Sequence, residues 1–207
     1  IIASLIFTES HAAGALPSVD GQLKLSGHVD GAIALPWQIS GKLRGGLHKA
    51  AIQELDLRLG DEDHAVDFTG AAALDFGAAP RIDATLKAHQ IDLDRLLTAK
   101  AAPPAMQRLV NAFGGLVQSN DLMASDMPIA VAWSADAAVL GGETLRGLSG
   151  SFSVAGKEAA RLRFAASGPG GSSLSLDGTI ETGIAAGFKG RILASATDVP
   201  RLSQWLH

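Results

Sequence analysis

Few side chains in this 207-residue sequence are of a type and spacing that could do chemistry. The most acidic point is Asp61–His64, whose carboxylates and imidazole could hold a cation. It lacks the alternating ligands and central glycine of a calcium loop, and no pair of the six histidines has the helical spacing of a zinc site. Asp61–His64 is therefore predicted to be the solvated tip of a hairpin, and no metal site is expected.

Phosphate-binding loops and nucleophiles give equally weak signals. The glycine-rich stretch SGPGGSS (167–173) lacks the Lys-Ser/Thr ending of a phosphate-binding loop. The stretch GLSGSF (147–152) does not match the nucleophile elbow of a hydrolase. A Ser/His/Asp triad assembles in space, so the sequence leaves it open, but no pattern favours one. We therefore expect a protein that is not an enzyme, with no catalytic residues and no cofactor.

Composition and charge narrow the class of partner. The formal net charge is -4, and the 17 Lys and Arg residues are scattered, which argues against nucleic acid. Hydrophobic residues make up 47% of the chain. Alanine-rich stretches such as GAAALDFGAAP (70–80) could account for this value, and so could apolar surface kept for a ligand. The apolar run IIASLIF (1–7) is too short to span a membrane.

Alternation of apolar and polar residues dominates the chain and predicts the elements that would position any site. In RIDATLKAH (81–89) every second residue is apolar, as expected of a half-buried strand. Short joints that contain glycine separate such runs, which is typical of hairpins, whereas parallel pairing would need long crossovers. We therefore predict a mainly β protein with long curved antiparallel meander sheets that form a groove or an open sandwich.

Helical spacing interrupts this pattern in Pro104–Gln118, where apolar residues recur every three or four positions. This stretch predicts one amphipathic connecting helix. Short capping helices are expected after Asp92 and Asp198, because each aspartate precedes a leucine-rich turn.

These two strand-to-helix phrases lie 106 positions apart (198 − 92) and suggest an internal repeat. We interpret residues 1–207 as one β-rich region. Within it, the approximate repeats are 1–97 and 128–207, joined by a helical segment at 98–127.

The apolar side of the predicted strands has two interpretations. It could be the buried core of a sandwich, which is the usual fate of such a face. It could instead line a groove for acyl chains. The candidate groove residues are Phe68, Leu74, Phe76, Ile82, Leu86, Val131, Trp133, Phe152, Phe164 and Leu176.

Residues 41–97 follow a recognisable order of short motifs. GKLRGGLHKAAIQEL (41–55) is followed by LDLRLG (55–60), by VDFTGAAALDFGAAPRIDATLKAH (66–89) and by the closing phrase IDLDRLL (91–97). This succession resembles the AsmA-like envelope proteins of Gram-negative bacteria. Residues 144–206 look like a degraded second copy, in which Asp198–Leu202 stands for Asp92–Leu96.

The resemblance implies a repeated β-groove that bridges membranes, tethered in the inner membrane and reaching into the periplasm. It also implies a role in outer-membrane assembly and phospholipid traffic, and it brings no catalytic residues. The expected partners are phospholipid or another acyl lipid, and a membrane reached through segments outside this sequence. The alternative is a structural or interaction β-scaffold that assists outer-membrane protein assembly without binding lipid.

Overall fold

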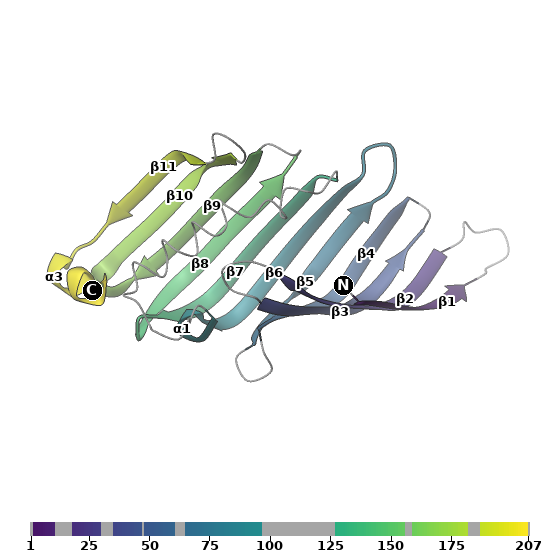
Figure 1. Ribbon diagram of the computed structural model, residues 1–207, viewed down its shortest axis with the longest axis horizontal. Coiled ribbons are helices and arrows are strands. Elements are labelled where there is room, and N and C mark those ends of the chain that lie inside the picture. Colours follow the sequence, from purple (N-terminus) through teal and green to yellow (C-terminus); the bar gives the residue numbers. More distant parts are fainter. Residues whose placement is uncertain are drawn as a thin grey trace.

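Strands dominate the described part of the chain (Figure 1). The computed structural model describes residues 2–10, 18–29, 35–46, 48–60, 65–96, 127–155, 159–181 and 187–206. The strands are β1 (Ile2–Ser10), β2 (Ser18–Val29), β3 (Leu35–Gly45), β4 (Lys49–Leu59), β5 (Val66–Asp75), β6 (Arg81–Asp92), β7 (Ile129–Leu140), β8 (Glu143–Val154), β9 (Ala159–Gly168), β10 (Ser172–Glu181) and β11 (Gly187–Ser195). The short helices are α1 (Leu93–Leu96), η2 (Pro169–Gly171) and α3 (Val199–Leu206).

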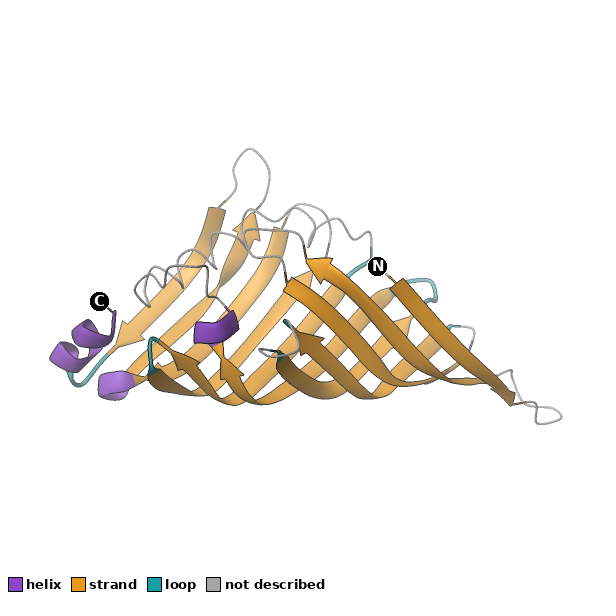
Figure 2. Ribbon diagram, turned by 60° about the horizontal axis from the view of Figure 1, so that its bottom comes forward, coloured by secondary structure: helices purple, strands orange, loops and turns teal. Residues whose placement is uncertain are grey.

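All these strands belong to one sheet of 11 strands, whose order in space follows the chain from β1 to β11. The sheet is curved and does not close, so β1 and β11 are its two edges (Figure 2). The prediction of a mainly β, curved meander is therefore confirmed. The described strands do not divide into two packed sheets, so the sandwich alternative is wrong for this part of the chain.

One joint of the sheet departs from the predicted antiparallel pairing. β6 and β7 are parallel, with Leu86 opposite Trp133, whereas every other neighbouring pair is antiparallel. The chain between these strands, residues 93–128, is long enough to carry the chain back to the starting end of β6. The prediction of purely antiparallel pairing was wrong here. The predicted helix Pro104–Gln118 lies within residues 97–126, outside the described residues.

The sheet has one apolar and one polar face, and its register keeps them apart across strands. A first line of directly opposed residues, here called the central row, consists of Leu55, Gly70, Leu86, Trp133, Gly150, Phe164, Leu176 and Ile192. A second row on the same side consists of Leu43, Ile52, Ala72, Ala84, Val131, Phe152, Leu162, Gly178 and Gly190. We call the side that carries these rows the apolar face.

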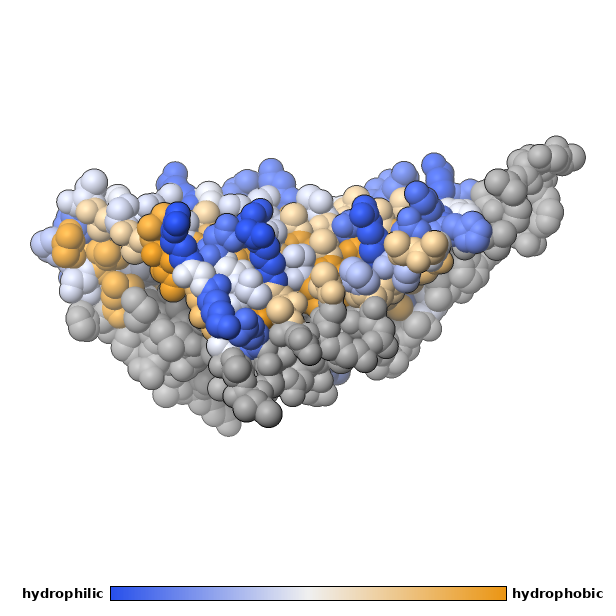
Figure 3. All heavy atoms as spheres, turned by 90° about the horizontal axis from the view of Figure 1, so that it is seen from above, coloured by the Kyte–Doolittle hydropathy of each residue, from blue (hydrophilic) through white to orange (hydrophobic). Residues whose placement is uncertain are grey.

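The opposite side is the polar face. One row there runs through Lys24, Ser40, Asp56, Thr69, Lys87, Ser134, Ser149, Ala165, Ser175 and Leu193. In Figure 3, hydrophilic side chains project along one long side of the molecule and hydrophobic ones gather lengthwise beside them. The sheet is therefore amphipathic over its length, as the period-two pattern predicted.

Local irregularities keep apolar side chains on the apolar face. In β4 the register shifts by one residue between Ile52 and Leu55. Glu54 lies in this β-bulge and has a φ of 50°. A one-residue slip would otherwise turn the rest of the strand inside out. On β6, β7 and β8 two buried residues are likewise three positions apart instead of two. These pairs are Ala88 and Ile91, Ala135 and Ala138, and Leu145 and Leu148.

A short helix follows β6 and β11, as predicted. Asp92 Oδ1 accepts a hydrogen bond from the backbone N–H of Arg95 at 3.0 Å, and Asp198 Oδ1 accepts one from Arg201 at 3.0 Å. These contacts are side-chain caps of the first helical turn. Both β2–β6 and β7–β11 are thus meanders that end in a capped helix (Figure 1). The internal repeat itself stays a prediction.

No helix among the described residues is long and apolar enough to span a membrane.

Candidate functional site: the apolar face

The register places most of the predicted groove residues on the apolar face. Leu86, Trp133, Phe164 and Leu176 lie in the central row. Val131 and Phe152 are directly opposed in the second row. Leu74 and Ile82 are opposed in the row beyond the second row. Phe68 lies opposite Leu57, in the row on the opposite side of the central row from the second row.

Phe76 is the exception, because it follows the end of β5 and is 51% exposed. It therefore lies outside the rows. β5 ends at Asp75, so the alternation of this strand does not continue to Phe76.

Exposure varies across the apolar face in a way that defines a strip. Between β6 and β10 the large residues of the central and second rows are partly buried. The flanking rows contain buried side chains: Ala135 and Leu148 on one side, in β7 and β8, and Val154, Ala160 and Ile180 on the other, in β8–β10. We call the partly buried part the apolar strip, made of Leu86, Val131, Trp133, Phe152, Leu162, Phe164 and Leu176. Its two rows are about 7 Å apart, the distance of two residues along a strand.

Glycines in these rows let large rings lie against the sheet. Gly150 is opposite both Trp133 and Phe164, whose ring centroids are 6.1 Å apart. A Cβ atom added to Gly150 would lie 2.5 Å from Cε2 of Trp133, so the indole covers this glycine. Trp37 covers Gly27 in the same way at the other end of the sheet. Such pairs give a smooth surface, because each ring occupies the space that a neighbouring side chain lacks.

The two capped helices border the apolar face at one end of the strands. Leu93 of α1 and Trp205 of α3 pack against the same buried cluster, which includes Leu140. The indole Nε1 of Trp205 donates a hydrogen bond of 2.7 Å to the carbonyl oxygen of Leu140. The carboxylate of Asp94 in α1 accepts hydrogen bonds from the backbone N–H groups of Gly141 and Gly142, at 2.6 and 2.9 Å. Both helices are thus fixed to the turn between β7 and β8.

These helix contacts and the ring-over-glycine pairs could not be predicted from the sequence. Both depend on which residues the register brings together from distant parts of the chain. A glycine opposite an aromatic residue could have served as a signal only after the strands had been paired.

The polar face is held by exposed ion pairs between neighbouring strands. Asp136 on β7 pairs with Lys87 at 3.6 Å and His89 at 3.0 Å, both on β6. The hydrogen bond from His89 and the charge of Lys87 hold the pKa of Asp136 below its usual value. A hydrogen bond from the backbone N–H of Gly77 lowers the pKa of Asp75 in the same direction.

Acid is expected to weaken the fold through these carboxylates. A folded-state pKa below the unfolded value stabilises the fold above about pH 4. That contribution is lost as the pH falls through the lowered pKa values of Asp75 and Asp136. Thermal unfolding measured from pH 6 to pH 2 should therefore show a falling Tm below about pH 4. Asp136→Asn should reduce this fall. The control Asp56→Asn should leave it as in the parent, because Asp56 forms no ion pair with another described residue.

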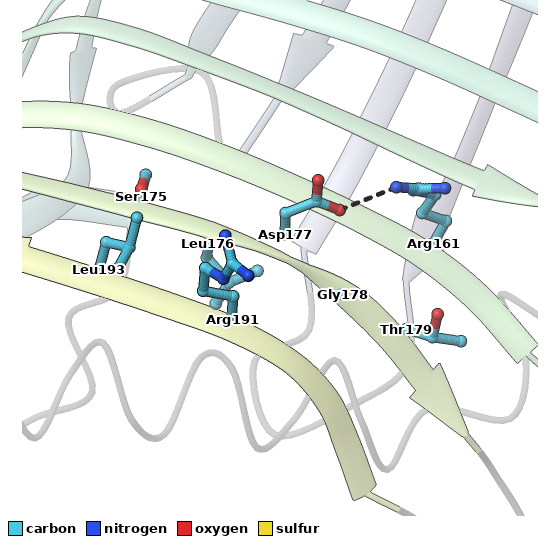
Figure 4. A pocket seen from close by; sticks show the side chains of 8 residues that line it. All are labelled: Arg161, Ser175, Leu176, Asp177, Gly178, Thr179, Arg191 and Leu193. Carbon is cyan, nitrogen blue, oxygen red and sulfur yellow. Dashed lines mark hydrogen bonds and ion pairs between the residues drawn. The ribbon is translucent and has the colours of Figure 1, made fainter.

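A hollow of about 550 Å³ lies at β9–β11 (Figure 4). It is lined by Arg161, Ser175, Leu176, Asp177, Gly178, Thr179, Arg191 and Leu193. Asp177 forms ion pairs with Arg161 at 3.2 Å and with Arg163 at 3.3 Å. Partial desolvation acts to raise the pKa of Asp177, but hydrogen bonds and charge from the two arginines outweigh it and lower the pKa.

The described residues contain no group of His, Cys, Asp and Glu side chains that could hold a metal ion. His28 and His89 are exposed, and the acidic run Asp61–His64 lies outside the described residues. No protein-family model, curated protein or solved structure matches the chain.

Proposed function

We propose that this chain is a non-enzymatic domain that binds or conducts phospholipid acyl chains along the apolar strip, in outer-membrane biogenesis. The observation that carries the proposal is the strip itself, an uninterrupted line of partly buried apolar side chains that crosses strand after strand. Buried residues flank it, on one side in β7 and β8 and on the other in β8–β10.

The dimensions of the sheet suit this role. The apolar strip crosses five strands, β6 to β10, and is therefore about 19 Å long at about 4.7 Å per strand. This is longer than one leaflet of a bilayer's hydrocarbon core, about 15 Å, so one acyl chain can lie along it. Each CH₂ group kept from water is worth about 0.8 kcal/mol, so a continuous apolar path offsets the cost of taking a lipid tail out of a membrane. If the lipid tail binds with similar affinity at each strand of the strip, it can move from one strand to the next.

The motifs in residues 41–97 support the same proposal, because they resemble those of AsmA-like envelope proteins. We propose on this basis a periplasmic location and a tether to the inner membrane through segments outside this sequence. Phospholipid, or another acyl lipid, is the proposed partner.

A second candidate is a β-scaffold that assists outer-membrane protein assembly without lipid. The fully buried clusters favour it, since Leu140, Val154 and Ile180 are no more than 1% exposed and form an ordinary core. Native mass spectrometry of the purified chain separates the two candidates. Co-purified phospholipid supports the first, and a lipid-free protein that also takes up none from added phospholipid supports the second.

Leu86→Arg tests whether the apolar strip holds the lipid. Leu86 is partly buried and lies between Gly70 and Trp133 in the central row, so a longer side chain can extend along the strip and keep its charge in water. A charge next to hydrocarbon costs about 2.5 kcal/mol or more, which corresponds to a loss of bound lipid of about fiftyfold. We expect lipid to be lost while the Tm falls by only about 5 °C.

The matched control is Thr85→Arg, one residue away on β6 and exposed on the polar face. It adds the same charge to the other side of the sheet and should keep the lipid. Global unfolding of Leu86→Arg, together with a parent that carries no lipid, would leave the scaffold as the better explanation. Equal lipid content in both variants and the parent would place the lipid elsewhere.

A further inference from the structure

The charge pattern of the polar face changes at its C-terminal end. Several ion pairs on this face join one cation to one carboxylate on the neighbouring strand, as in the pairs of Lys42 with Glu54 and of Arg44 with Asp20. At β9 and β10, two arginines share one carboxylate, that of Asp177.

A third arginine completes this group. Arg191 on β11 is directly opposite Asp177 and lines the same hollow, yet it forms no ion pair with any described residue. Figure 4 shows Asp177 between the side chains of Arg161 and Arg191. Two guanidinium groups therefore pair with the carboxylate of Asp177, and a third lies on the neighbouring strand without pairing to it, which leaves a local charge of about +2.

The neighbouring charges do not cancel this excess. Lys189 and Glu181, the adjacent charged pair on β11 and β10, neutralise each other at 2.8 Å. The hydroxyl groups of Ser175 and Thr179 line the hollow and add hydrogen-bond donors without charge. The whole chain has a formal net charge of -4, so a cationic hollow runs against the overall balance of the molecule.

We propose that this hollow binds a phosphate group, either of a lipid headgroup or of a small soluble compound. Arginine donates two parallel hydrogen bonds to phosphate oxygens. A phosphate monoester carries a charge of about −1.5 to −2 at pH 7 and a phosphodiester headgroup about −1, so the monoester offsets the excess almost fully and the diester about half of it. Asp177 holds Arg161 and Arg163 at one side, while Arg191 is available at the other. The arginines and Asp177 lie on the polar face, on the opposite side of the sheet from the apolar strip, with which the hollow shares only Leu176, so this charged site does not depend on the proposed lipid transfer.

The experiment uses the full 207-residue chain and two probes. Inorganic phosphate is titrated by isothermal calorimetry, and flotation is measured with phosphatidylglycerol vesicles beside phosphatidylcholine vesicles. Saturable binding of inorganic phosphate supports a soluble ligand. Flotation with phosphatidylglycerol alone supports a headgroup. Failure of both probes overturns the proposal.

Arg191→Gln should weaken binding to the responding probe by about tenfold, because it removes an arginine of the hollow that pairs with no carboxylate among the described residues. Arg191→Lys should recover only part of this loss, since lysine keeps the charge but not the fork of donors. Arg146→Gln is the control, because Arg146 is exposed on β8 and does not line the hollow. Equal weakening by Arg146→Gln and Arg191→Gln would show attraction by general charge and would overturn the site. Unchanged thermal unfolding of each variant separates loss of binding from loss of fold.

Discussion

The Gly70→Val variant is expected to lose about 3 kcal/mol of unfolding free energy, a Tm decrease of about 6–12 °C in thermal unfolding. Gly70 lies in the central row between Leu55 and Leu86. A Cβ atom at this position would fall on the backbone carbonyl oxygen of Thr85. Backbone cannot rotate away as a side chain can, so β5 and β6 would have to separate locally.

Ala71→Val is the matched control for this substitution. Ala71 is the next residue on β5 and is exposed on the polar face. Valine is favoured in strands, so we expect a change within about 0.5 kcal/mol. A Gly70→Val protein as stable as the control would mean that the two strands do not approach each other as closely as described.

Leu140→Ala is expected to cost about 3 kcal/mol or more, because Leu140 is fully buried at the end of β7. Its side chain lies in the cluster to which both α1 and α3 are attached, and its carbonyl oxygen accepts the hydrogen bond of Trp205. The cavity left by alanine would loosen the attachment of both helices. Urea unfolding should show a lower midpoint with little change in slope.

The control for Leu140→Ala is Leu193→Ala, which makes the same chemical change on β11. Leu193 is 58% exposed, so the expected loss is below about 0.5 kcal/mol. If both variants lost similar stability, the turn between β7 and β8 would not be the point that fixes the helices.

Alternation of residue types was sufficient to predict the strands and the side of the sheet on which most candidates lie. Leu86, Trp133 and Phe164 share a row because each strand repeats with period two and the register aligns them. The caps at Asp92 and Asp198 could likewise be predicted, since a cap depends only on residues within one turn.

Features that depend on pairing between distant segments could not be predicted. The parallel pairing of β6 with β7 is one such feature, because alternation within a strand does not show in which direction the neighbouring strand runs. The hollow at β9–β11 needed the register that sets Arg191 opposite Asp177. A signal was present, since Arg161 and Arg163, like Lys189 and Arg191, are spaced two residues apart. Their strands had to be paired before it had meaning.

The parallel joint also gives the molecule a sense of direction. A regular antiparallel meander can be turned by half a rotation about an axis through the sheet, and its two ends then exchange places. The pairing of β6 with β7 has no such axis, and α1 and α3 each follow the last strand of a meander. The edges at β1 and β11 are therefore not interchangeable. As a result, the parallel pair and the two helices occur in a different order when the sheet is followed from β1 than when it is followed from β11.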